Sequence, residues 1–320
     1  MNNLLQITHL NTCFPTPGGM LHAVKDVTLT IDKGKTVALV GESGSGKSMT
    51  ALSVMRLVPP PGRIVSGSIT FQGSELLEMS AADMRTIRGR HIGMIFQDPM
   101  TSLNPVLRIG EQVQEPMMLH LGMSKEDASA KAAQLLKSVG IPSAENRLRD
   151  YPHQLSGGMR QRVMIAMALA CDPDLLIADE PTTALDVTIQ AQILELIDSL
   201  RSSSQMGIIL ITHDLGIVAE RSDITCVMYA GCIVESAPSL TLLKAPAHPY
   251  TRALLNSLPQ NAEPGKPLST LGGQLTPQDC RSAGCSFQPR CPVALPQCSS
   301  QMPQLKEINP GHLVRCWNCR

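Results

Sequence analysis

The sequence predicts an α/β fold with a largely parallel sheet, and two observations carry this prediction. The first is a glycine-rich stretch, residues 41–48, which fits G-x-x-x-x-G-K-[ST] and stands between an apolar, strand-like run and a helix-like run. The second is the alternation of apolar runs at residues 175–178 and 207–211 with an amphipathic helical pattern at residues 187–200. Strands that are separated by helices in this way form parallel sheets.

Composition limits the classes of function. Of the 320 residues, 43% are hydrophobic, which is enough for the core of one large domain with an appendage, or of two domains. Lys+Arg and Asp+Glu both number 27, so the net charge is zero and nothing indicates a nucleic-acid partner. No apolar run reaches the ~18 residues of a membrane span, and the N-terminus lacks a signal-peptide pattern. We therefore expect a cytosolic chain that reaches a membrane only by docking on other proteins.

Strands are also expected outside the parallel core. Residues 4–10 and 24–31 alternate between apolar and polar side chains, as strands of a half-buried antiparallel sheet do. Proline and glycine at residues 15–19 predict the turn between them, and residues 67–71 add a short strand. The segment 224–235 is typical of a hairpin.

The rest of the chain predicts a helical insertion and a C-terminal appendage. The pattern is helical over residues 109–148, with Pro116 and Pro142 as breaks, so we expect a helical subdomain at about residues 98–170. After residue 236 the periodicity weakens, and proline, serine, glutamine and cysteine dominate. We expect a nucleotide-binding domain at residues 1–236 and a small extension at residues 237–320.

The glycine-rich stretch has the chemistry of a phosphate-binding loop. Its glycines permit backbone conformations in which amides turn inward around phosphate oxygens, and the following helix adds the positive end of its dipole. Lys47 should reach the β- and γ-phosphates, and the Ser48 hydroxyl should bind Mg²⁺. A glycine-rich turn that binds nothing is the alternative. The predicted nucleotide contacts here are Gly41, Glu42, Ser43, Gly44, Ser45, Gly46, Lys47, Ser48 and Met49.

Two carboxylates end the apolar run at residues 175–178. Asp179, at the strand tip, is placed to hold Mg²⁺, and Glu180 follows where a base could polarise the attacking water. A pair of solvated acids is the alternative, which the upstream phosphate-binding loop disfavours.

A second helix start suited to an anion lies at residues 155–162, LSGGMRQR. Ser156 is a good N-cap, and Gly157 and Gly158 open the backbone for close approach. One chain cannot easily bring two such helix starts to one phosphate, whereas two chains arranged head to tail can. A capped helix with a flexible start is the alternative interpretation.

The LSGGMRQR run resembles the signature of ABC ATPases, and five other motifs stand in that family's order. They are Walker A at residues 41–48, the Q-loop glutamine Gln97, Walker B at residues 175–180, the D-loop at residues 184–186 with Asp186, and the switch histidine His213. The resemblance covers roughly residues 1–235. It implies a P-loop NTPase fold, with a RecA-like core, an antiparallel β-subdomain and a helical subdomain.

The same resemblance implies roles for the matched residues. ATP would lie between the phosphate-binding loop of one subunit and Ser156, Gly157 and Gly158 of its partner, and His213 would act on the γ-phosphate in cis. Phe14 is the candidate for stacking on adenine. The implied catalytic residues are Glu180, His213 and Lys47, and the implied Mg²⁺ contacts are Ser48, Gln97 and Asp179.

Four further segments resemble the ATPases of peptide and nickel importers, and most of all the D-type subunits of dipeptide permeases. These segments are residues 95–105, 151–154, 179–190 and 248–255. The resemblance implies an ATP-hydrolysing subunit, bound peripherally at the cytoplasmic face of the inner membrane. Its implied partners are a second ABC ATPase subunit, two membrane permeases and a periplasmic or extracellular binding protein. The second ATPase would preferably be a similar subunit in a heterodimer, with a homodimer as the alternative. Nickel or another small solute is the alternative cargo, and a soluble ABC ATPase acting in DNA repair or translation is a less favoured alternative.

Ten cysteines are present, six of them after residue 279. The four at Cys285, Cys291, Cys298 and Cys316 resemble a motif that carries a [4Fe-4S] cluster in some members of the importer subfamily. Four thiolates would also fit Zn²⁺, and reduced free thiols are the third possibility. Cys280 and Cys319 could compete as ligands. In a segment poor in hydrophobic residues, a metal would take the place of a core.

Overall fold

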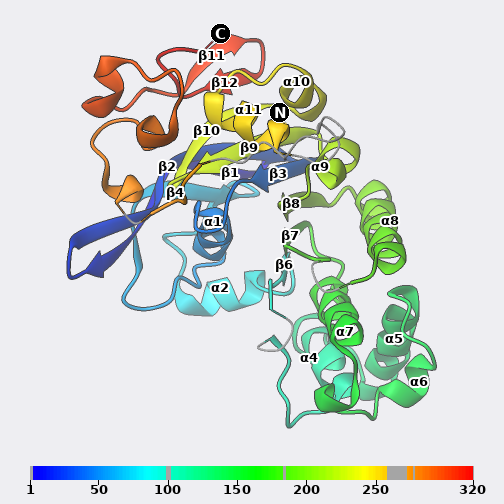
Figure 1. Ribbon diagram of the computed structural model, residues 1–320. Helices are drawn as coiled ribbons and strands as arrows, with labels where there is room; N and C mark the ends of the chain where they lie inside the picture. Colours follow the sequence, from blue (N-terminus) through cyan, green and yellow to red (C-terminus); the bar gives the residue numbers. More distant parts are fainter. Residues whose placement is uncertain (1–2, 99–101, 183–184, 258–271, 277, 320) are drawn as a thin grey trace. The chain divides into compact units, whose positions relative to one another are not determined.

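The computed structural model describes residues 3–98, 102–182, 185–257, 272–276 and 278–319. The chain divides into two compact units. The first unit consists of Met1–Leu4, Ile31–Lys35 and Glu78–Ile211, and the second of Leu5–Thr30, Thr36–Leu77 and Thr212–Arg320. Each unit contains strands and helices of its own (Figure 1).

An antiparallel sheet, in the order β2-β1-β4-β5, holds the long N-terminal strands. Its strands are β1 (Asn3–Thr16), β2 (Gly19–Asp32), β4 (Arg63–Phe71) and β5 (Ser74–Glu75). β4 pairs antiparallel with β1 on one side and with β5 on the other. The predicted strands lie within these elements, but β1 and β2 are longer than predicted, and the turn between them is confined to residues 17–18.

The second unit also contains the strand that precedes the predicted phosphate-binding loop. Here β3 (Thr36–Val40) pairs in parallel with β9 (Ile224–Tyr229), which forms the predicted hairpin with β10 (Cys232–Pro238). β12 (His312–Val314) pairs antiparallel with β10, and β11 (Lys306–Asn309) pairs antiparallel with β12. The helices of this unit are α1 (Lys47–Val54), α9 (Leu215–Arg221), α10 (Ser239–Lys244) and α11 (Pro249–Asn256).

A buried carboxylate fixes α11 against β10 and β12. Glu235 is fully buried and accepts hydrogen bonds from the amides of Ala247 (2.7 Å) and His248 (2.9 Å) and from Nε2 of His312 (2.7 Å). His248 in turn accepts from the amide of Tyr250 at 3.0 Å, and burial lowers the pKa of its imidazole to about 3, so that it stays neutral. This network fixes the start of α11 and the position of Tyr250.

Three aromatic rings form the centre of the second unit's core. Tyr229 of β9, Tyr250 of α11 and Phe287 are each at most 1% exposed, and their centroids lie 4.7–5.3 Å apart. The tilted and edge-on contacts are the favourable arrangements for aromatic pairs. In a chain with only 2% aromatic residues, this cluster packs the C-terminal segment against the same strands that carry the loop.

The first unit contains the parallel strands that the continuous apolar runs predicted. β6 (Ile92–Ile95), β7 (Leu175–Asp179) and β8 (Gly207–Ile211) pair in parallel in the order β8-β7-β6, and every residue in them is buried. The helices α2 (Ala81–Ile87) and α8 (Val187–Ser204) belong to the same unit.

Four helices of the first unit pack together in the region predicted to be a helical subdomain (Figure 1). They are α4 (Ile109–Leu121), α5 (Lys125–Ser138), α6 (Ala144–Arg147) and α7 (Gly157–Leu169). Pro116 was predicted to break the helix, and this is wrong, because α4 continues through it. Val113 and Met117 are fully buried, and this packing outweighs the local cost of proline.

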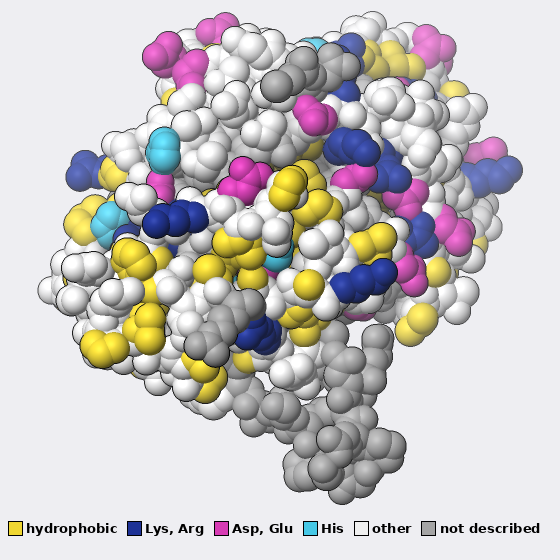
Figure 2. Space-filling model, turned by 90° about the horizontal axis from the view of Figure 1, so that it is seen from above, with side chains coloured by type: hydrophobic (Ala, Val, Ile, Leu, Met, Phe, Trp, Pro, Cys, Tyr) yellow, Lys and Arg dark blue, Asp and Glu magenta, His cyan; other side chains and the backbone are white. Residues whose placement is uncertain are grey.

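The surface carries both signs of charge. On the face shown in Figure 2, Lys and Arg side chains are interspersed with those of Asp and Glu. Among the helices that the structure describes, none combines the length and the hydrophobicity needed to span a bilayer.

Candidate functional site

The glycine-rich stretch lies between β3 and α1, which is the predicted context for a phosphate-binding loop. Gly41, Gly44 and Gly46 have φ values of 152°, 78° and 106°, in the region that side chains disfavour. A Cβ atom at Gly41 would lie 2.2 Å from the carbonyl oxygen of Met228, and one at Gly46 would lie 2.5 Å from that of Ala23. Both glycines are therefore required by conformation and by close backbone approach.

Lys47 is folded back into this loop. Its side chain is 7% exposed, and Nζ donates to the carbonyls of Gly41 (2.7 Å) and Glu42 (2.9 Å) and to Oγ of Ser45 (3.4 Å). A compact ammonium is thus held inside the glycine-rich turn, where its donors can be passed to phosphate oxygens. Ser48 and Met49 follow in the first turn of α1.

His213 follows the end of β8 and is exposed. The preceding residue, Thr212, donates its amide to the carbonyl of Leu39 in β3 at 3.3 Å. The next residue, Asp214, caps α9 by accepting from the amides of Gly216 (2.8 Å) and Ile217 (3.3 Å). Hydrogen bonds of both neighbouring residues therefore fix the position of His213, close to the strand that carries the loop.

Phe14, predicted to stack on adenine, is in β1 and partly buried. A Cβ atom at Gly62 would come within 2.4 Å of its ring, so the ring packs against the backbone of that glycine. The adenine contact itself stays a prediction.

In the first unit, three of the predicted residues follow neighbouring parallel strands at the same edge of the sheet. Asp179 ends β7 and is 4% exposed, and Glu180 follows it with its amide donating to Ile211 at 2.9 Å. Glu180 has a φ of 49°, which is uncommon for a residue with a side chain and typical of strained functional positions. Gln97 lies two residues after β6, the strand paired with β7, and is exposed.

The signature stretch forms the N-terminus of α7. Ser156 is the N-cap, and its hydroxyl accepts from the amide of Met159 at 3.3 Å. Ser156 and Gly157 are exposed, and a Cβ atom at Gly157 would meet nothing within 4 Å. Arg160 fixes the preceding turn by donating to the carbonyls of Pro152 (2.8 Å) and Leu155 (3.1 Å). The helix start is thus rigid yet open to an incoming group.

Asp186, the predicted D-loop residue, is the N-cap of α8. Its carboxylate accepts from the amide of Ile189 at 3.0 Å. Ala184 of the same motif lies outside the described residues, as do residues 99–101 of the segment that follows Gln97.

The predicted residues thus fall into two groups. The phosphate-binding loop, Phe14 and His213 belong to the second unit. Gln97, the acidic pair, the signature helix start and Asp186 belong to the first unit.

The four cysteines predicted to bind a cluster occur in one short region of the second unit. The amide of Cys285 donates to the carbonyl of Cys298 at 2.8 Å. Burial raises the pKa of Cys285 and that of Cys316 to about 11, with smaller contributions from neighbouring thiols, Cys291 among them. Across the described ranges, no group of three or more His, Cys, Asp or Glu residues is placed to hold a metal ion. Within these described ranges, the structure therefore does not support the predicted [4Fe-4S] cluster.

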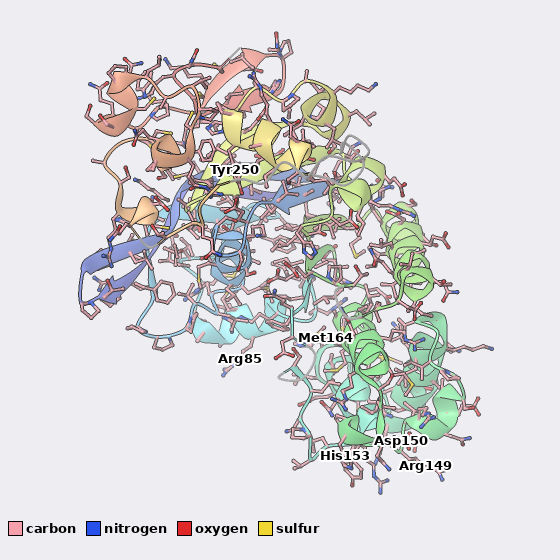
Figure 3. All side chains as sticks on the ribbon, in the orientation of Figure 1. Arg85, Arg149, Asp150, His153, Met164 and Tyr250 are labelled. Atoms are coloured by element: carbon pink, nitrogen blue, oxygen red, sulfur yellow. The ribbon has the colours of Figure 1, made fainter. Side chains whose placement is uncertain are left out.

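Two residues that the sequence did not single out contact the loop. Arg290 makes two hydrogen bonds to the carboxylate of Glu42, and the hydroxyl of Tyr250 accepts from the Glu42 amide. Tyr250 is in α11 (Figure 3). Both residues follow residue 236, so the C-terminal segment contacts Glu42 of the predicted phosphate-binding loop.

A phosphate-binding loop after a buried strand is common to many NTPases. An LSGG helix start within a helical subdomain narrows the class to the ATP-binding cassette ATPases. The family model described as "ABC transporter" matches residues 24–183, and the one described as "Oligopeptide/dipeptide transporter, C-terminal region" matches residues 234–298. The chain belongs to the ABC transporter family, and it is an ATPase of that family.

Several curated proteins are similar to this chain over nearly its whole length. A putative peptide import ATP-binding protein of Brucella melitensis is 50% identical over 98% of this chain and 96% of its own length. The oligopeptide transport ATP-binding protein OppD of Salmonella typhimurium is 48% identical, over 99% of this chain and 94% of its own. The dipeptide transport ATP-binding protein DppD of Bacillus subtilis is 47% identical, over 99% and 95%.

Solved structures share the cassette fold. A dimeric, post-hydrolysis structure of the ATP-binding cassette MJ0796 bound to ADP and Pi has a TM-score of 0.68 and 26% sequence identity. The structural match covers 73% of this chain and 98% of the MJ0796 chain. The P-loop NTPase fold of the ABC type is thereby confirmed.

Proposed function

We propose that this chain is the ATP-hydrolysing subunit of a peptide importer. The observation that carries the proposal is the match to peptide-import ATPases over 98–99% of the chain, including a C-terminal region characteristic of oligopeptide and dipeptide transporters. An importer of nickel or another small solute would use the same machinery, and the ATPase itself does not touch the cargo.

The roles proposed at the nucleotide site follow from the side chains. Residues 41–49 hold the phosphates, and Lys47 binds the β- and γ-phosphates. The oxygen donors of Ser48, Gln97 and Asp179 are of the type that Mg²⁺ prefers, and Mg²⁺ neutralises phosphate charge when bound. Glu180 polarises the attacking water, and His213 acts on the γ-phosphate.

The proposal includes a head-to-tail dimer in which the signature of one subunit binds the nucleotide of the other. The exposed, rigid N-terminus of α7 supports it, since such a helix start accepts anions. The dimeric structure of MJ0796, which covers most of this chain, is a further argument. Asp186 and the rest of the D-loop would lie at the same subunit interface.

Ser156→Arg tests this arrangement. In a Glu180→Gln background, we expect the substitution to abolish ATP-dependent association with a second ATPase subunit, because arginine would fill the space of the partner's γ-phosphate. Affinity of the isolated chain for ATP should change less than about twofold, since Ser156 acts on the partner's nucleotide. Size-exclusion chromatography and a fluorescent-ATP titration measure the two quantities. Ser138→Arg, at the exposed end of α5, is the control, and persistent association of the Ser156→Arg chain would contradict the proposal.

The proposed assembly places the chain under two membrane permeases, peripherally at the cytoplasmic face of the inner membrane. A second ABC ATPase, in a heterodimer, and a periplasmic or extracellular binding protein complete it. Support comes from the relatives' peptide-transport names. Permease and binding-protein genes beside this one would be the expected neighbours.

The [4Fe-4S] cluster is retained only as a sequence-based hypothesis, and no step of the mechanism depends on it. Anaerobic purification should give an iron–sulfur absorbance band that Cys291→Ser removes and Cys13→Ser, in β1, leaves intact. A colourless chain without bound iron would eliminate the cluster.

A further inference from the structure

Glu42, the second residue of the phosphate-binding loop, makes hydrogen bonds through its amide, its carbonyl and its carboxylate. Its amide donates to the hydroxyl of Tyr250 at 2.9 Å, and its carboxylate oxygens each accept from Arg290 at 2.9 Å. Its carbonyl accepts from Nζ of Lys47 at 2.9 Å. Glu42, which bonds directly to Lys47, therefore also makes three hydrogen bonds with two residues of the C-terminal segment.

The Arg290 side chain is largely buried and makes several contacts besides those with Glu42. Its side chain is 9% exposed, and it also donates to the Tyr229 hydroxyl (3.3 Å) and the Gly272 carbonyl (2.8 Å). The guanidinium lies 5.7 Å from the ring centroid of Tyr229 and 6.0 Å from that of Phe287. A bidentate, stacked and largely buried arginine differs from an exposed ion pair, which contributes little because solvent screens it.

The charge of Glu42 makes this contact relevant to the ligand. A carboxylate within a loop that binds a triphosphate repels that ligand unless a cation neutralises it. The hydrogen bonds to Glu42 raise the pKa of Arg290 further above its usual value, so Arg290 carries its charge at every physiological pH. Exchanging arginine for a neutral residue would leave this carboxylate, only 25% exposed, without its cation in the loop assigned to the phosphates.

We propose that Arg290 is a positioning residue of the ATP site, which neutralises Glu42 and, together with Tyr250, fixes the start of the phosphate-binding loop. The C-terminal segment thereby sets the affinity of the chain for ATP. The proposal rests on the assignment of residues 41–48 to the ATP phosphates. The simpler alternative is that the pair only tethers the segment to the core.

Arg290→Ala and the double variant Glu42→Gln/Arg290→Ala separate these alternatives. In the full chain, Arg290→Ala is expected to raise the Kd for ATP about tenfold, since it removes a charge-assisted pair and leaves a like charge beside the ligand. The double variant should recover most of this loss, because glutamine removes the uncompensated charge. A tether would behave differently, since the double variant breaks the pair as fully as the single one.

Two controls complete the experiment, which uses Mg-ATP titration and thermal unfolding on each variant. Lys306→Ala removes a positive charge from the exposed strand β11 of the same segment and should leave Kd unchanged. Lys47→Ala should lose ATP affinity whatever Arg290 does, and normal affinity in that variant would show that the loop assignment itself has failed.

Two results would overturn the role of Arg290 while Lys47→Ala behaves as expected. One is a Kd for Arg290→Ala equal to that of Lys306→Ala, even if the melting temperature falls. The other is a double variant as weak as Arg290→Ala, since neutralisation of Glu42 would then contribute nothing. A lower affinity that the second substitution restores supports the proposal.

Discussion

Glu180→Gln is expected to lower the rate of ATP hydrolysis by about 10²–10⁴-fold, roughly 3–5.5 kcal/mol in barrier, while ATP binding persists. Glutamine has the shape of glutamate but cannot accept a proton from the attacking water. The backbone at this position, with a φ of 49° and its amide bonded to Ile211, does not depend on the carboxylate and should be retained. Single-turnover hydrolysis measures the loss.

The same substitution should trap the ATP-bound dimer, because closure requires ATP and opening requires its hydrolysis. Size-exclusion chromatography with Mg-ATP would detect the dimer. Glu195→Gln is the matched control, since Glu195 is an exposed glutamate on α8 of the same unit. Unchanged turnover in Glu180→Gln would exclude this residue as the base.

Local patterns predicted the parts of the fold that depend on local physics. The strands β3 and β7 are continuous apolar runs because both faces are buried, and each ends at the residues with the predicted chemistry. Gly41 and Gly46 were predicted from a motif, and the structure gives the reason, since carbonyl oxygens of other strands lie within 2.5 Å of any added Cβ.

Contacts between distant residues could not be predicted in this way. Arg290 and Glu42 are separated by 248 positions, and neither periodicity nor spacing links them. The one available signal for Arg290 was its charge in an otherwise weakly patterned segment, next to Cys291. The helix break predicted at Pro116 was wrong because the helix-breaking tendency of proline is a local effect, whereas α4 is stabilised by packing.

Lys47→Ala is expected to weaken ATP binding by about 100-fold, which is near 3 kcal/mol and typical of losing charge-assisted hydrogen bonds to phosphate. The side chain is nearly buried and bonded to the carbonyls of Gly41 and Glu42, so alanine also removes a contact that shapes the loop. Lys47→Arg separates the two effects, because it keeps the charge but replaces the compact ammonium by a larger planar group, and should recover only part of the affinity. Lys33→Ala, on the exposed turn before β3, is the control for loss of a positive charge. Undiminished ATP affinity in Lys47→Ala would mean that this loop, despite its glycines and buried lysine, is not where the triphosphate binds.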